Sequence, residues 1–126
     1  MNIKNLLGHK LFLFFAVFLT AAIGFGSTFS TSNIVVIQPF DFFDKVVHIG
    51  AYATLTASWL LYFGDKNDQR KYMFLTALSV LIYGIIIEAI QGTLTANRQA
   101  DLFDIFANLV GIVIALLFFS KILQKK

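Results

Sequence analysis

The chain has 126 residues, of which 58% are apolar and only 13% are charged. A water-soluble domain of this length has too little interior to bury that much apolar surface, which includes 15 Phe side chains, so we expect lipid to be its solvent. The net charge is +3, but the Lys and Arg residues form no dense patch, which argues against nucleic-acid binding. The sequence contains no Cys, which excludes disulfides and thiol chemistry.

Four apolar segments follow one another along the chain, and each is long enough to cross a bilayer as a helix. They cover residues 11–29, 44–63, 72–92 and 102–120. They lack the strict alternation of a membrane β-barrel, and helices satisfy their own backbone groups in lipid. We therefore predict an all-α, polytopic membrane protein: a bundle of four transmembrane helices forming one domain over residues 1–126.

The first segment has a second interpretation, because a basic start, an apolar run and small residues are also typical of a cleaved signal peptide. The small residues are Gly24, Gly26 and Ser27. The length of the run and the three further segments favour an uncleaved first helix.

The basic residues predict the orientation of these helices, because Lys and Arg concentrate in cytoplasmic loops. One side would carry two basic residues, Lys45 and Arg98. The other side would carry eight: Lys4, Lys10, Lys66, Arg70, Lys71, Lys121, Lys125 and Lys126. We expect a multi-pass protein of the cytoplasmic (inner) membrane with both termini in the cytoplasm.

Polar residues are predicted to gather at the outward ends of the last three helices. Within each group they recur at intervals of three or four, which places them on one helix face. The groups are Asp44, Lys45 and His48; Glu88 and Gln91; and Arg98, Asp101, Asp104, Asn108 and Gly111. Tyr52 continues the first stripe, and Gly84 and Gly111 would permit close helix approach.

Glu88 lies deepest, about 9 Å below the outer end of its helix at a rise of roughly 1.5 Å per residue. A carboxylate at that depth must be paired, protonated or in a water-filled cavity. Structural roles are open for each residue alone. Asp44, Asp101 and Asp104 could cap helices, Lys45 could reach the interface, and Glu88 could pair with Arg98. Their convergence from three helices favours an outward-facing polar pocket.

Three kinds of chemistry are available to such a pocket. His48 beside a carboxylate could act as an acid or base, with Glu88 and Asp104 as further candidate catalytic groups. The same acids and Asp101 could bind a divalent metal with His48. Lys45 and Arg98 could hold a phosphate, with Asp44, Gln91, Asp101 and Asn108 as further ligand-binding candidates.

These motifs, in this order, resemble the VanZ-like family, which is named after a protein associated with teicoplanin resistance. The matching motifs are Asp44-Lys45-Val-Val-His48, Glu88-Ala-Ile-Gln91 and Arg98-Gln-Ala-Asp101-Leu-Phe-Asp104-Ile-Phe-Ala-Asn108-Leu-Val-Gly111. The resemblance covers roughly Asp41 to Leu117. Before Arg98, where family members often have proline or glycine, this chain has Thr95-Ala96-Asn97. The resemblance implies a small multi-pass inner-membrane protein, with a link to glycopeptide tolerance for the founding member and no established biochemical activity.

Three functions therefore stay open. The first is an envelope protein whose pocket binds a membrane-lipid headgroup, a lipid-linked cell-wall precursor or a partner membrane protein. The second is a membrane-embedded hydrolase or transferase that uses His48 and the carboxylates, with or without a divalent metal. The third is a proton or ion carrier with Glu88 as its relay, although no polar residue string continues from Glu88 toward the cytoplasm.

Overall fold

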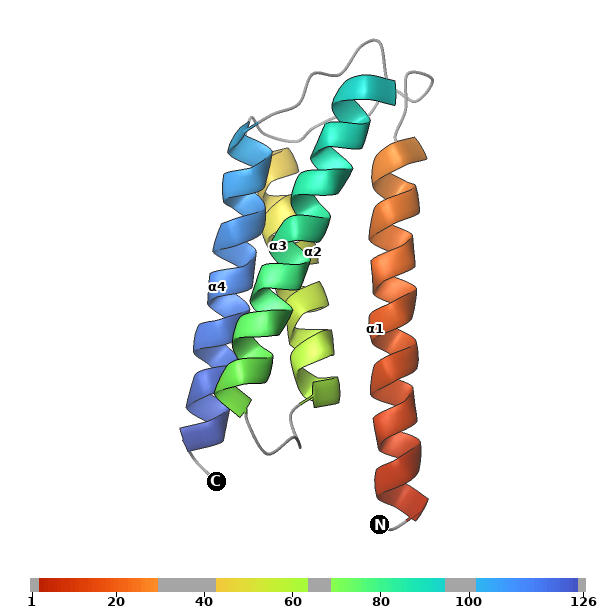
Figure 1. The fold of residues 1–126 in the computed structure, drawn as a ribbon, viewed down its shortest axis with the longest axis vertical. Coiled ribbons are helices and arrows are strands. Elements are labelled where there is room, and N and C mark those ends of the chain that lie inside the picture. Colours follow the sequence, from red (N-terminus) through yellow and green to blue (C-terminus); the bar gives the residue numbers. More distant parts are fainter. Residues whose placement is uncertain (1–2, 30–42, 64–68, 95–101, 125–126) are drawn as a thin grey trace.

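A computed structural model of the chain describes residues 3–29, 43–63, 69–94 and 102–124, and the side-chain surroundings within 8–26, 43, 45–63, 70–90 and 102–121. These residues form α1 (Ile3–Phe29), α2 (Phe43–Phe63), α3 (Gln69–Leu94) and α4 (Leu102–Gln124). All four are long and apolar enough to cross a membrane (Figure 1). The predicted all-α architecture of four packed membrane-spanning helices is confirmed.

The helices extend beyond the apolar segments that predicted them. α1 begins at Ile3 rather than at residue 11, α3 begins at Gln69 rather than at 72, and α4 continues to Gln124 rather than ending at 120. Hydropathy marks the part of a helix that lies in lipid, whereas helical hydrogen bonding continues into water. The candidate spans are accordingly shorter than the helices and cover Gly8–Gly26, Lys45–Phe63, Arg70–Ile90 and Leu102–Lys121.

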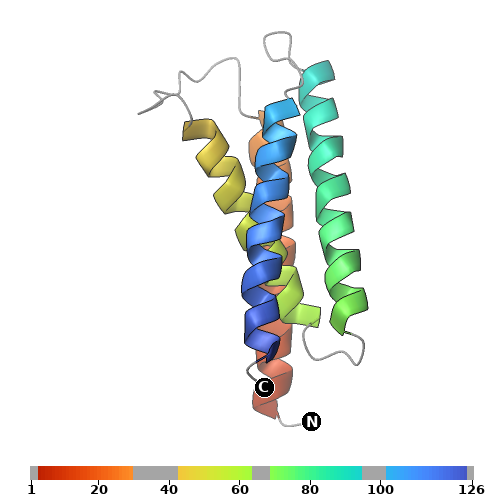
Figure 2. The same cartoon turned by 90° about the vertical axis from the view of Figure 1, so that its left-hand side faces the viewer.

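α2 is the central helix of the bundle. Within the described segments it packs against α1, α3 and α4, and its interface with α4 is the most extensive. Among the described residues α1 contacts α2 and α3 but not α4, and it stands at the edge of the bundle (Figure 1). The start of α1 and the end of α4 lie at one end of the molecule, which we call the termini end (Figures 1 and 2). The starts of α2 and α4 and the end of α3 lie at the opposite end, which we call the polar end.

The distribution of apolar side chains is that of a protein surrounded by lipid. The buried core is small and centres on Tyr52, Leu55, Val80 and Ile112, from α2, α3 and α4. Many of the largest apolar side chains instead point outward, as Phe14, Phe74, Phe103 and Phe118 do on α1, α3 and α4. Such an apolar exterior would be costly in water and is the expected surface of a bundle within a bilayer.

α2 and α4 approach each other closely at Gly111. A Cβ atom added to Gly111 would overlap the backbone carbonyl of Ile49 and would lie 2.9 Å from the backbone nitrogen of Ala53. The glycine therefore permits the two backbones to come into contact, as small residues do at interfaces between membrane helices. This crossing sets the register in which the polar side chains at the starts of α2 and α4 face each other.

Candidate functional site

An ion pair joins the starts of α2 and α4 at the polar end. Lys45 lies in the first turn of α2 and Asp104 in the first turn of α4. The Lys45 Nζ atom donates a hydrogen bond to Asp104 Oδ1 over 2.5 Å. The Asp104 side chain is 3% exposed and that of Lys45 is 22% exposed. The carboxylate is thus buried between the helices, near the positive end of the α4 dipole, and the ammonium covers it on the accessible side.

His48 lies one turn further along α2 and faces the next turn of α4. Its Nδ1 atom lies 2.8 Å from Asn108 Oδ1, and its Nε2 atom lies 3.8 Å from Asp104 Oδ1. An amide oxygen only accepts hydrogen bonds, so this geometry assigns the ring proton to Nδ1. In neutral His48 the Nε2 atom then carries the lone pair, on the side that faces Asp104. We call Lys45, His48, Asp104 and Asn108 the polar cluster.

Gly84 of α3 packs against the polar cluster, next to Asn108 and Tyr52. A Cβ atom at Gly84 would lie 2.9 Å from Asn108 Nδ2 and 3.1 Å from Tyr52 Cε1. A larger residue at this position would require the side chain of Asn108 or Tyr52 to shift. The ring of Tyr52 lies parallel to that of His48, with centroids 6.4 Å apart and an interplanar angle of 4°. Gly84 and Tyr52 thus pack against the hydrogen-bonded pair and hold it in place.

Glu88 is buried one helical turn beyond Gly84, toward the polar end of α3. Only 2% of the residue is exposed, and it takes part in a polar interaction within the protein. Asp104 and Asn108 are equally buried on α4. Three polar side chains in a membrane-spanning bundle are therefore enclosed at the same end, where the sequence predicted a pocket. Burial of this kind is expensive and is typical of a site that binds, transports or reacts.

The structure brings together only part of the predicted set. Lys45 contacts Asp104, and His48 lies close to both Asp104 and Asn108. Glu88 is buried on α3 at the same end of the bundle. Asp44 and Gln91 lie on α2 and α3, but their side chains are outside the described part of the chain. Arg98 and Asp101 are both outside the described residues.

The described residues do not provide a ligand set for the predicted divalent metal. Within the four described segments, no group of three or more His, Asp or Glu side chains is placed to hold a metal ion. His48 and Asp104 are the nearest to such a group, and Asp104 is already paired with Lys45. The predicted ligand Asp101 is outside those segments.

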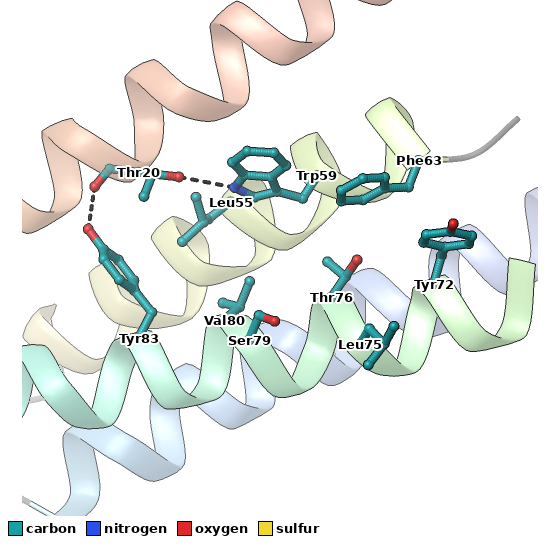
Figure 3. Close-up of a pocket in the computed structure, with 10 residues that line it drawn as sticks. All are labelled: Thr20, Leu55, Trp59, Phe63, Tyr72, Leu75, Thr76, Ser79, Val80 and Tyr83. Atoms are coloured by element: carbon teal, nitrogen blue, oxygen red, sulfur yellow. Dashed lines mark hydrogen bonds between the residues drawn. The ribbon is translucent and has the colours of Figure 1, made fainter. Parts of the chain in front are cut away.

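A second polar contact, absent from the sequence-based prediction, joins α1 to the bundle. The indole Nε1 of Trp59 donates a hydrogen bond to Thr20 Oγ1 over 3.0 Å, and Thr20 Oγ1 donates in turn to the Ala16 carbonyl over 2.7 Å. The Tyr83 hydroxyl donates to the Thr20 carbonyl (Figure 3). Residues such as Trp59 and Tyr83 are common in membrane helices, so nothing in their sequence spacing marks them as a contact.

The polar cluster can do two things chemically. The partly exposed Lys45 ammonium can contact an anion while Asp104 fixes its position. The Nε2 atom of His48 can accept a proton, since Asn108 holds the ring in the required tautomer.

Comparison with known proteins does not place the chain in a family. No family model matches it, and no match was found among curated proteins or among solved structures.

Proposed function

We propose that this protein is a VanZ-like integral membrane protein of the cell envelope, and that its polar end faces outward and binds the phosphate of a lipid headgroup or a lipid-linked wall precursor. The order and spacing of the three polar motifs support the family relationship. No matching family model, curated protein or solved structure adds to that support. The distribution of Lys and Arg, eight against two, supports the orientation.

The observation that carries this proposal is the arrangement of Lys45 and Asp104. A lysine at the membrane boundary could simply reach into water. This ammonium is instead held 2.5 Å from a buried carboxylate, and its side chain keeps 22% of its surface exposed. A cation fixed in this way loses little conformational freedom when it contacts a phosphate. Asp104 then serves as a positioning residue, so Asp104→Asn, which preserves polarity, should affect binding mildly.

The test is a binding measurement on protein reconstituted in phosphatidylcholine nanodiscs. The probes are a polyprenyl diphosphate and, separately, phosphatidylglycerol, so that the two phosphate sources are distinguished. Lys45→Gln should weaken binding of the preferred probe about tenfold or more, as expected for loss of a charge-assisted contact worth roughly 1.5–3 kcal/mol. Arg70→Gln, a cation removed near the other end of the bundle, is the matched control and should bind as the wild type does. Equal binding by Lys45→Gln and wild type would refute the proposal.

The family relationship extends the proposal to glycopeptide tolerance. A strain from which the gene is deleted should become more susceptible to teicoplanin, and expression of the wild-type chain should restore tolerance. If the Lys45→Gln variant restores tolerance at equal membrane abundance, tolerance does not depend on the proposed phosphate site.

The tautomer of His48 favours a second candidate, a membrane-embedded hydrolase or transferase. An imidazole whose Nδ1–H is held by an amide oxygen, and whose Nε2 lies 3.8 Å from a carboxylate oxygen, has the arrangement of a general base. In this version Lys45 would hold the phosphate, and Glu88 or Asp104 would be the further acid.

This alternative predicts turnover rather than binding alone. The reconstituted protein should release phosphate from the polyprenyl diphosphate, and His48→Gln should abolish release while leaving binding intact. Metal analysis of the purified protein and release in the presence of EDTA would reveal any dependence on a divalent cation. Activity that survives in His48→Ala would eliminate the mechanism.

A further inference from the structure

A cavity lies between α1, α2 and α3, toward the termini end and away from the polar cluster. Its volume is about 410 Å³, and aromatic and apolar side chains form most of its wall (Figure 3). Trp59 and Phe63 line it from α2, and Tyr72, Val80 and Tyr83 line it from α3. The volume is within the range of roughly 300–1,000 Å³ that is usual for small-molecule sites.

All parts of the chain that line this cavity belong to candidate membrane spans. Thr20 is within Gly8–Gly26, Trp59 and Phe63 are within Lys45–Phe63, and the α3 residues are within Arg70–Ile90. The neighbouring solvent is therefore hydrocarbon. The contact between α1 and the bundle is loose here, because α1 buries only 6% of its span. The chains of surrounding lipids thus have access to the cavity from the side.

Some of the polar groups in the wall are hydrogen-bonded to one another. Trp59 Nε1 donates to Thr20 Oγ1, and the Tyr83 hydroxyl donates to the Thr20 carbonyl. The hydroxyls of Tyr72, Thr76 and Ser79 also line the wall, but aromatic and apolar side chains form most of it. The cavity is thus better suited to an apolar occupant than to water.

The termini end of the cavity is bounded by stacked rings. The rings of Phe63 and Tyr72 lie 5.5 Å apart at 19°, and those of Trp59 and Phe63 lie 5.9 Å apart at 21°. Flat ring faces complement a narrow chain. A helix from a second protein is too wide, because a helix about 10 Å across would fill this volume with roughly one turn.

We propose that this cavity binds a single hydrocarbon chain, acyl or isoprenoid, of a lipid from the leaflet at the termini end. An adjoining cavity of about 450 Å³ shares Thr20, Trp59 and Tyr83 and is lined further by Val17 and Phe25 of α1. The same hydrogen-bonded residues therefore separate two lipid-accessible spaces beside α1. This inference does not depend on the proposed phosphate site, which lies at the other end of the bundle.

The sequence provides its own probe, because Trp59 is the single tryptophan in the chain and lines the cavity. The full-length protein is placed in phosphatidylcholine nanodiscs with increasing fractions of a lipid brominated along its acyl chain, and Trp59 fluorescence is recorded. A chain held in the cavity lies against the indole, so Trp59 should be quenched more strongly at each fraction of brominated lipid than an indole that contacts only the surrounding lipid. Ser79→Phe, which fills the cavity, should lose this excess.

Two controls separate the cavity from general lipid contact and from misfolding. Leu78→Phe adds the same ring to the adjacent position, which is exposed on the lipid-facing side, and should retain the excess quenching. Val80→Ala, which enlarges the cavity, should retain it as well. Quenching that follows the bulk fraction equally in all variants would overturn the proposal, as would quenching by aqueous acrylamide with no excess from brominated lipid, which would indicate a water-filled cavity.

Discussion

Lys45 Nζ and Asp104 Oδ1 are 2.5 Å apart although 59 residues separate them in the sequence, and they join the first turns of two membrane helices. The pair is asymmetric, because the carboxylate is buried and the ammonium is partly accessible. Loss of the lysine would remove the ammonium next to a buried carboxylate, whereas loss of both charges removes the conflict.

The first prediction is a double-mutant cycle on this pair. Lys45→Met should destabilise the protein more than the double variant Lys45→Met/Asp104→Asn, with a coupling energy on the order of 1 kcal/mol. Unfolding in mixed micelles with increasing SDS, followed by circular dichroism, measures the difference. Strictly additive effects would show that the two side chains do not interact in the membrane.

The second prediction concerns the close crossing of α2 and α4. Gly111→Ala should destabilise the protein by about 1–3 kcal/mol, the usual cost of overpacking, because the added Cβ meets the backbone at Ile49 and Ala53. Gly50→Ala is the matched control, since a Cβ at Gly50 has no atom within 4 Å. The same SDS titration applies. A Gly111→Ala variant as stable as Gly50→Ala would contradict the crossing.

The third prediction tests the attachment of α1. Thr20→Val removes the acceptor for Trp59 Nε1, and it should destabilise the protein by about 0.6 kcal/mol, as typical for a hydrogen bond between membrane helices. Trp59 emission should shift at the same time, because the indole loses its partner. Thr54→Val is the control, since Thr54 Oγ1 bonds the Gly50 carbonyl within its own helix. Identical Trp59 spectra in wild type and Thr20→Val would exclude the contact.

The fourth prediction concerns orientation. The chain has no native Cys, so single-cysteine variants report without background. A membrane-impermeant maleimide should label Asn97→Cys in intact cells, and it should label Lys126→Cys after the cells are opened. Labelling with the two positions reversed would place the polar end in the cytoplasm and would remove the basis for binding an external ligand.

Hydropathy and length were sufficient to predict four helices because lipid leaves few alternatives for the backbone. The end of the bundle that carries Lys45, His48, Asp104 and Asn108 was predictable. These residues lie near the starts of their segments, and successive membrane helices run in alternating directions. The helix ends at Ile3 and Gln124 were not predictable from hydropathy, because hydropathy does not reveal helical residues that lie outside the lipid.

The partners within the polar cluster were not predictable, because they depend on how α2 is rotated about its axis. That rotation is fixed where Gly111 meets Ile49 and Ala53, a contact between residues far apart in the sequence. The contact of Thr20 with Trp59 depends on the position of α1 in the same way. A pattern of spacing specifies a face of one helix, and only packing specifies the residue opposite to it.

The dominant interface between α2 and α4 has a consequence for the biosynthesis of the protein. α4 is synthesised after α1, α2 and α3, and it supplies Asp104, Asn108 and Gly111, so half of the polar cluster does not exist until α4 has been made. Until then α2 and α3 must rest in the translocon or bilayer with the polar residues Lys45, His48 and Glu88. Truncated chains that stop before α4 should therefore be targets for membrane quality control, whereas chains whose α1 is replaced by another apolar helix should mature.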